Sequence, residues 1–339
     1  MGLELTWFIL LAVLLAGYAV LDGFDLGAGI LHLLARGDRE RRIVMNAIGP
    51  IWDGNEVWLI TFGGALFAAF PYAYATAFSG FYIPFMLLLC ALIFRAVSIE
   101  FRSKIASQRW RYFWDYGFFA SSLVASLLFG VAVGNAMIGV PLDAQGNMTA
   151  SFVDLLNPYG LLTGLLAVAM FAMHGSLYLH LKTPPGELHD RIRNWMWHTW
   201  GIFLVLYILT TMYTLVMIPR ATANFSRLPW AGLVVVLNVL LIANIPRSIF
   251  TGRSFQAFFS SGLSICCLVF LLAMALWPNL VTASNNPDYT LTVYRAASTG
   301  KTLWIMLVIA LIGMPFVLGY TALVYWTFRG RVELGDHSY

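Results

Sequence analysis

The chain has 339 residues, of which 60% are hydrophobic and only 11% are charged. Soluble domains are about half apolar and roughly 25% charged, so this composition excludes an ordinary water-soluble protein. It also excludes disordered, fibrous and disulfide-framework classes. Because about 20 apolar residues cross a bilayer, we expect an all-α, polytopic integral membrane protein.

Nine long apolar stretches, bounded by charged or turn residues, are the candidate spans. They occupy residues 5–34, 51–70, 77–97, 115–139, 158–181, 196–218, 229–246, 255–277 and 302–328. Residues 1–21 contain no Lys or Arg, so the first stretch lacks the basic region of a signal peptide and is expected to be retained. Pro84 and Pro315 fall inside spans, where membrane helices tolerate kinks. We expect residues 1–339 to form a single transmembrane helical domain.

The basic residues are divided unevenly between the two sets of loops. The loops after the first, third, fifth and seventh spans, together with the C-terminal tail, carry fifteen Lys and Arg residues. The N-terminus and the other loops carry only Arg220, Arg227, Arg295 and Lys301. Since cytoplasmic loops are enriched in Lys and Arg, we expect the N-terminus outside and the C-terminus in the cytoplasm. This topology accounts for the net charge of +4, and no nucleic-acid partner is expected.

Four acidic residues lie within spans, where a charge costs roughly 2.5–3.5 kcal/mol on insertion scales. Asp22 and Asp25 belong to the first span, and Asp53 and Glu56 to the second. Each pair has i,i+3 spacing, which places both carboxylates on one helix face. The two spans are antiparallel, so both pairs are expected at one depth towards the cytoplasm. Carboxylates at close range cannot all be ionised, and this arrangement is typical of a proton relay.

A structural interpretation of the same acids stays open. In this interpretation the acids are counter-ions for Arg95 or for the basic loops. Asp53 and Glu56 could alternatively interact with the positive N-terminal end of the second helix. Arg95, in the third span, is deep enough to reach an acid on the first or second span and to keep it ionised. A cation site would also require hard oxygen ligands, and the sequence does not separate protons from other cations.

Other residue patterns predict packing rather than chemistry. Gly23, Gly27 and Gly29, and likewise Gly130 with Gly134, have small-residue spacings that let helices approach closely. His174 is the only histidine well inside a span, and a lone histidine in a helix is more often structural than a ligand. No Cys/His cluster has zinc spacing, and no phosphate loop or nucleophile elbow is present, so no metal site is predicted.

Several of these segments resemble a known family. Residues 17–27, 50–60 and 63–71 resemble the signature of subunit II of the cytochrome bd ubiquinol oxidases. Shorter matching segments are Phe94-Arg95, residues 102–104, Gly134-Asn135 and residues 155–162. The resemblance is close over the first 190 residues, and beyond them it follows the span pattern and the His337-Ser338-Tyr339 ending.

The resemblance implies a subunit of a bacterial inner-membrane oxidase that oxidises ubiquinol and reduces dioxygen to water with cytoplasmic protons. The haems, of types b and d, are ligated by the partner subunit I. This subunit is expected to support assembly, proton uptake and dioxygen access. Some members also hold a structural quinone, whose site the resemblance does not place. A small accessory subunit and membrane lipid are further partners that it allows, and the cyanide-insensitive branch shares the same motifs.

The resemblance also assigns expected roles to single residues. Asp53 matches the proton-channel aspartate of the family, and Trp58 matches the tryptophan near the mouth of its oxygen channel. Asp22 and Asp25 match the acidic motif of the first helix. Glu56 stands where some members have Gln. The alternative class is a proton-coupled transporter, but the chain shows no repeat between its halves, and its acids lie off-centre.

Overall fold

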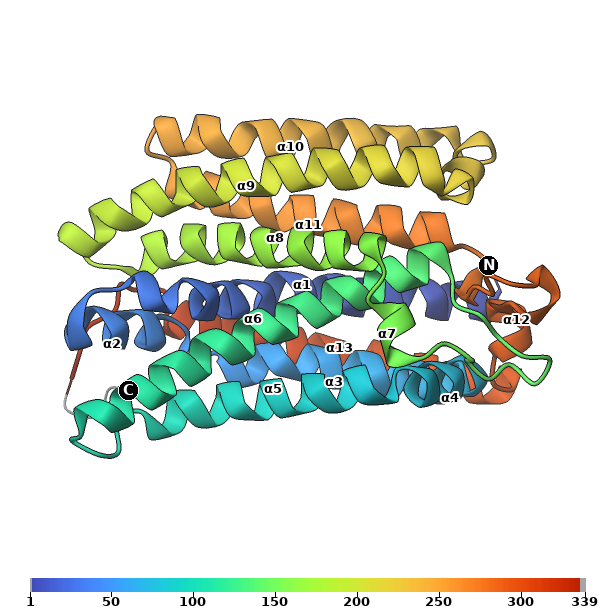
Figure 1. The fold of residues 1–339 in the computed structure, drawn as a ribbon, viewed down its shortest axis with the longest axis horizontal. Coiled ribbons are helices and arrows are strands. Elements are labelled where there is room, and N and C mark those ends of the chain that lie inside the picture. The colour runs from blue at the N-terminus through green and yellow to red at the C-terminus, as the bar shows by residue number, and fades with distance from the viewer. Residues whose placement is uncertain (1, 336–339) are drawn as a thin grey trace.

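The computed structural model describes residues 2–335, and almost all of its regular structure is helical (Figure 1). The long helices are α1 (Leu3–Leu31), α3 (Trp52–Ala69), α5 (Tyr82–Phe101), α6 (Gln108–Ile138), α8 (Pro158–Lys182), α9 (Glu187–Met217), α10 (Gly232–Phe250), α11 (Ser254–Leu276) and α13 (Gly300–Thr327). The shorter helices are α2 (Gly37–Ile48), α4 (Pro71–Gly80), α7 (Phe152–Leu155) and α12 (Val293–Ala296). The remaining elements are η1 (His32–Leu34), η2 (Pro219–Ser226), η3 (Pro229–Ala231), η4 (Pro287–Tyr289) and the antiparallel strands β1 (Asn279–Val281) and β2 (Leu291–Thr292).

Eight helices within residues 2–335 are long and apolar enough to cross a membrane. They correspond to eight of the nine expected spans. The remaining expected span, at residues 51–70, coincides with α3, which has 18 residues. Its mean hydropathy is lowered because its first turns carry Asp53, Asn55 and Glu56.

The central helix of the bundle is α1, which packs against α3, α6, α8 and α11 (Figure 1). Glycines allow these close approaches, as their spacing predicted. A Cβ atom on Gly27 would lie 1.9 Å from the carbonyl oxygen of Phe171, and one on Gly175 would lie 2.7 Å from the Gly27 Cα atom. On α6, a Cβ on Gly130 would lie 2.4 Å from the Thr163 carbonyl oxygen. Only glycine fits these crossings without moving a backbone.

Two asparagines fix the end of the α6–α8 pair. Asn135 on α6 donates from Nδ2 to the Leu155 carbonyl at 2.8 Å, and Asn157 donates to Asn135 Oδ1 at 2.9 Å. Asn157 also caps α8, because its Oδ1 accepts from the Gly160 N–H at 2.8 Å. Residues 134–135 and 155–162, two of the segments whose sequence resembles the oxidase subunit family, therefore form one hydrogen-bonded corner.

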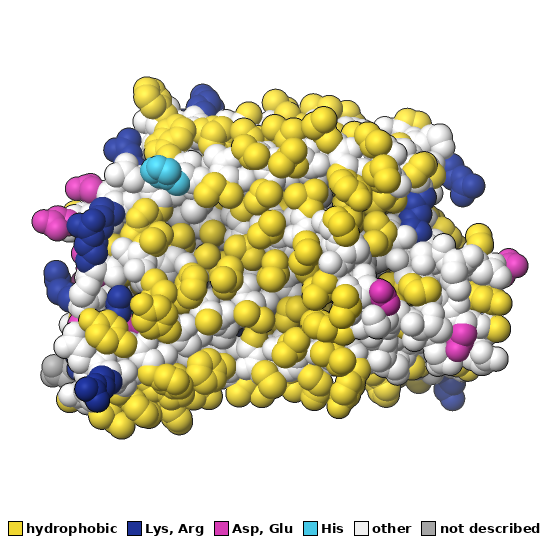
Figure 2. All heavy atoms as spheres, in the orientation of Figure 1, with side chains coloured by type: hydrophobic (Ala, Val, Ile, Leu, Met, Phe, Trp, Pro, Cys, Tyr) yellow, Lys and Arg dark blue, Asp and Glu magenta, His cyan; other side chains and the backbone are white. Residues whose placement is uncertain are grey.

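The surface of the bundle carries a broad apolar band, and charged side chains lie at its two ends (Figure 2). Exposed apolar side chains are found on α5, α9, α10 and α13; examples are Ile93, Val205, Leu240 and Ile309. A soluble monomer rarely exposes so continuous an apolar surface, whereas a lipid-facing surface requires one.

The boundaries differ from the expected ones mainly near the third span. The chain turns at Phe81 between α4 and α5, so α5 begins at Tyr82 rather than near residue 77. Pro84 consequently lies in the first turn of α5, where its missing N–H removes no helical hydrogen bond, and it is not a mid-helix kink. Pro315 lies inside α13, as expected. The His337-Ser338-Tyr339 ending lies outside the described residues.

Candidate functional site

A buried ion pair links α1 and α5. The Arg95 side chain on α5 is 1% exposed, and its Nη2 donates to Asp22 Oδ1 at 2.7 Å. The same nitrogen lies 3.4 Å from Glu56 Oε2 at the start of α3. A buried charge is costly unless it is paired, so Asp22 and Glu56 make the burial of Arg95 tolerable. The expectation that Arg95 reaches an acid on the first or second span is confirmed.

A second set of hydrogen bonds surrounds Asp25, which lies one turn further along α1. Asn55 on α3 donates from Nδ2 to Asp25 Oδ2 at 2.7 Å and to the Leu21 carbonyl at 3.2 Å. Tyr325 near the end of α13 donates its hydroxyl to Asn55 Oδ1 at 2.8 Å. Asp25 and Asn55 are fully buried, and three helices therefore meet at one amide side chain.

Asp53 does not join this buried group. On α3, Asn55 and Trp58 are buried towards α1, whereas Asp53 is exposed. Each helical residue turns by about 100°, so Asp53 lies on the face opposite Asn55, and Glu56 lies at the edge between them. Of the four acids expected at one site, Asp22 and Asp25 are buried, Glu56 is half-buried beside Arg95, and Asp53 is exposed on the far face of α3.

Several buried polar atoms around the ion pair have no protein partner among residues 2–335. They are Asp22 Oδ2, Asp25 Oδ1, Arg95 Nε and Nη1, and the Tyr18 hydroxyl. Buried polar atoms in proteins nearly always have a hydrogen-bond partner, and ordered water supplies it where protein does not. The buried polar site thus keeps five atoms that can still donate or accept hydrogen bonds.

Trp58 lies beside this polar group but in apolar surroundings. Its ring covers Gly17, where a Cβ atom would lie 2.4 Å from Trp58 Cε3, and it packs with Leu14 and Tyr18. An apolar groove of about 410 Å³ runs along Gly17 and Trp58 between α1 and α13 and also contacts Tyr325. The groove brings an apolar path next to the buried polar residues.

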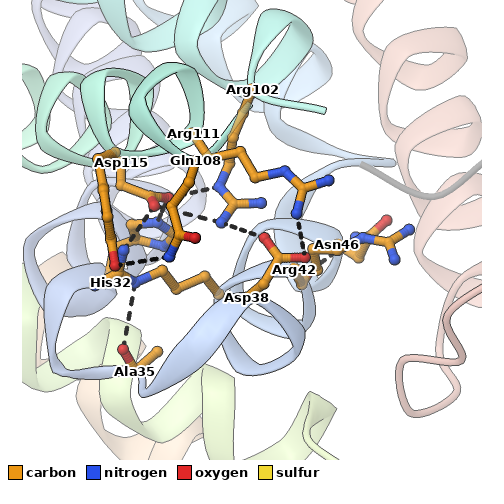
Figure 3. Close-up of polar contacts among 11 residues, drawn as sticks. His32, Ala35, Asp38, Arg42, Asn46, Arg102, Gln108, Arg111 and Asp115 are labelled. Carbon is orange, nitrogen blue, oxygen red and sulfur yellow. Dashed lines mark hydrogen bonds and ion pairs between the residues drawn. The ribbon is translucent and has the colours of Figure 1, made fainter. Parts of the chain in front are cut away.

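A second buried charge cluster, centred on Asp115, lies at the end of the bundle (Figure 3). Asp115 accepts from Arg102 Nε at 2.5 Å and from Arg41 Nη1 at 2.7 Å, and its Oδ1 lies 2.6 Å from His32 Nε2. Arg102 also donates to Asp38 at 2.9 Å. One carboxylate thereby joins η1, α2 and the C-cap of α5 to α6.

The sequence reasoning missed this Asp115 cluster. The sequence holds one clue to this cluster, because Asp115 is the only acidic residue of α6. It lies at the edge of the expected span at residues 115–139, and an acid at a span edge looks like an ordinary interfacial residue.

The His174 ring is held by contacts at both of its nitrogens. His174 is fully buried on α8, with Nε2 3.1 Å from the Val20 carbonyl and Nδ1 2.6 Å from Ser261 Oγ. A carbonyl only accepts, so Nε2 carries a proton, while Nδ1 contacts the Ser261 hydroxyl, which also donates to the Phe258 carbonyl at 2.8 Å. The His174 ring also stacks on Phe258 with centroids 4.7 Å apart. Neither nitrogen of His174 is therefore free for a metal.

Of the other described histidines, three have one ring nitrogen engaged. His32 Nε2 contacts Asp115, His180 Nδ1 contacts Ser254 and His198 Nδ1 contacts the Asn194 carbonyl. Within residues 2–335, no group of three or more His, Cys, Asp or Glu side chains is arranged to hold a metal ion.

Comparison with known proteins identifies relatives across nearly the whole chain. Residues 3–328 match the family model described as cytochrome bd terminal oxidase subunit II. The cytochrome bd-I ubiquinol oxidase subunit 2 of Escherichia coli (strain K12) is 38% identical over 98% of this chain and 96% of that protein. The cytochrome bd ubiquinol oxidase subunit 2 of Bacillus subtilis (strain 168) is 35% identical over 96% of each chain.

A solved structure shares the fold. A chain in the structure of bd oxidase from Geobacillus thermodenitrificans superimposes with a TM-score of 0.78, covering 97% of this chain and 99% of that one. The sequence identity of this pair is 16%, so the likeness shows the fold alone.

Proposed function

The chain belongs to the cytochrome bd terminal oxidase subunit II family, and from that membership we propose that its buried acids form part of the proton route of a quinol oxidase. As subunit II, it is a multi-pass membrane component of an oxidoreductase complex in the respiratory chain. The family implies haem and quinol in that complex and a partner subunit I. Because the chain belongs to this family, we no longer consider the alternative class, a proton-coupled transporter.

We propose a division of labour within the complex. The complex oxidises ubiquinol and reduces dioxygen to water, and subunit I ligates the haems of types b and d. The engaged ring nitrogens of His174 support the assignment of the haem ligands to subunit I. Its own contribution is assembly with subunit I and access for protons and dioxygen.

The proposed proton route starts at the exposed Asp53, passes Glu56 and reaches the Asp22–Arg95 pair and Asp25. Glu56 supports this order, because its side chain is 19% exposed and also lies 3.4 Å from Arg95. Proton transfer needs titrating groups connected by hydrogen bonds or water. The unpartnered oxygens of Asp22 and Asp25 are the single observation that favours such a hydrated connection over a purely structural ion pair.

Replacement of Asp25 by Asn tests the inner end of the route. An amide keeps the size and accepts the Asn55 hydrogen bond, but it cannot titrate. We expect turnover per haem to fall by about tenfold, less than for a complete block, because Asp22 remains beside it. Haem content should stay normal in absorption spectra of the purified complex, and Asp288→Asn, an exposed acid at the other end of the bundle, is the control. Unchanged turnover in Asp25→Asn would contradict the route.

We propose that dioxygen approaches along the groove beside Trp58. Dioxygen is small and apolar, and the groove is lined almost entirely by apolar atoms of α1, α3, α11 and α13. Its position beside Trp58 and Tyr325 supports access from lipid to the interior of the complex.

We propose nine spans in one helical domain of the bacterial inner membrane, with the N-terminus outside. Eight of these spans are the long apolar helices, and the remaining one, second in chain order, is α3. Trp7 near the start of α1 donates to the Leu303 carbonyl near the start of α13, while Asn55 joins Asp25 and Tyr325 near the ends of these two helices. The two helices are therefore parallel (Figure 1), which requires an odd number of crossings.

A topology reporter tests this orientation. A reporter that is active only outside the cytoplasm should be silent when fused after Tyr339, because the basic residues concentrate at that end of the spans. A reporter active only in the cytoplasm should give a strong signal at the same position. The reverse pattern would overturn the orientation.

A further inference from the structure

Helix α13 packs loosely on the rest of the bundle, and its polar attachments lie at its two ends. Of its 28 residues, only Leu303 is buried. At the start of α13, the Leu303 carbonyl accepts from Trp7 Nε1 at 2.9 Å. Between the two ends, α13 makes half-buried contacts through Leu307, Ala310 and Met314, and two apolar grooves of about 230 and 410 Å³ run beside these contacts. The position of its last turns therefore depends on the contacts at the C-terminal end.

Those contacts come from Lys182, the last residue of α8. Its Nζ donates to the carbonyls of Phe328 and of Gly330, the latter at 2.7 Å. Phe328 is the C-cap of α13, and the last carbonyls of a helix have no partner within the helix. A cation at this end also interacts favourably with the helix dipole. Lys182 thus caps α13 from another helix.

The segment after α13 continues the attachment. The Val332 N–H donates to the Lys182 carbonyl at 2.8 Å, so Lys182 binds this segment through both its ammonium group and its backbone. Val332 and Leu334 pack against a buried cluster that includes Ile48 and Ile192. In Figure 1 this red segment lies against the end of α8, where α9 begins.

Tyr325 lies one turn before the capped end of α13. It is the α13 residue whose hydroxyl reaches Asn55, and Asn55 in turn binds Asp25. A shift of the last turn of α13 would break a hydrogen bond of 2.8 Å, because such bonds weaken steeply with distance and angle. The cap at Lys182 therefore acts on the buried acids through Tyr325.

We propose that Lys182 is a positioning residue. Together with residues 328–334 it forms a C-terminal clasp that holds Tyr325 on Asn55 and so fixes the environment of Asp25. The functional consequence rests on the proposed proton route, whereas the clasp itself is a statement about structure. Lys182 touches none of the buried acids and acts only through α13.

Hydrogen exchange and turnover of the purified oxidase complex test the clasp in four variants: Lys182→Met, Lys182→Arg, Tyr325→Phe and the Lys182→Met/Tyr325→Phe double variant. Lys104→Met, an exposed lysine on a cytoplasmic loop, is the control. Mass spectrometry reads exchange in peptides covering residues 323–334. We expect roughly tenfold faster exchange there in Lys182→Met, because charge-assisted hydrogen bonds to the end of α13 are lost. Lys182→Arg keeps the charge and donors and should restore protection.

Turnover per haem separates positioning from a merely structural role. It should fall in Lys182→Met to the level of Tyr325→Phe, and the double variant should be no slower than Tyr325→Phe alone, since both changes break one connection. Unchanged exchange in Lys182→Met, or losses that multiply in the double variant, would overturn the proposal. Fast exchange in Lys182→Met together with normal turnover in Tyr325→Phe would overturn the positioning role of Lys182, and leave the clasp as a structural contact without touching the proton route.

Discussion

Replacement of Asp53 by Asn is expected to slow oxygen reduction per haem by on the order of 10²–10⁴-fold, the usual contribution of a positioned acid or base. A parallel route in subunit I would reduce this loss. Asn keeps the size and the polarity of Asp but has no titrating proton. Assembly and haem content should remain normal, because Asp53 is exposed and makes no hydrogen bond or ion pair within residues 2–335. Oxygen consumption with excess quinol, normalised to haem absorbance, is the measurement.

Glu56→Gln is the matched comparison for Asp53→Asn, one helical turn away on α3. The resemblance places Gln at this position in some family members, so Glu56 serves the route by hydrogen bonding, which Gln retains, and Glu56→Gln should change turnover far less than Asp53→Asn. The structural interpretation predicts another pattern. If Asp53 only favours the N-terminal end of α3, Asp53→Asn should cost about 0.3–1 kcal/mol of stability and leave turnover per haem unchanged. That second pattern would remove Asp53 from the proposed route.

The features that the sequence predicted correctly are those set by local pattern. Span positions follow from runs of apolar residues, and the depth of Arg95 follows from its place in such a run. The close approach at Gly27 and Gly130 follows from small residues at helical spacing. In each case the physical cause lies within one segment, so one segment is enough to predict it.

The features that escaped prediction depend on contacts between distant segments. The i,i+3 spacing of Asp53 and Glu56 relates them to each other, but it does not tell which face of α3 meets α1. Asn55 and Trp58 occupy that face, and Asp53 is therefore exposed. Tyr325 joins Asn55 across 270 positions of the sequence, and no local pattern marks either residue as a partner of the other.

Removal of the Arg95 charge is expected to be the most destabilising single change at the buried site. In Arg95→Gln, Asp22 is left fully buried without its counter-ion, and breaking a buried pair in this way costs about 3–5 kcal/mol. The yield of assembled, haem-containing complex and its midpoint of thermal unfolding should both fall. Arg109→Gln removes an exposed arginine near the same end of the bundle and should leave both unchanged.

The double variant Asp22→Asn/Arg95→Gln isolates the pair from its surroundings. Both buried charges are then absent, and Glu56, which is 19% exposed, can reach solvent, so most of the lost stability should return. If Arg95 served only to hold Asp22 in the buried interior, the recovered complex would also recover its turnover per haem. The proposed proton route predicts a different result, because the double variant lacks a titrating Asp22. It should assemble well and still turn over slowly, and normal turnover in that variant would assign the Asp22–Arg95 pair to structure alone.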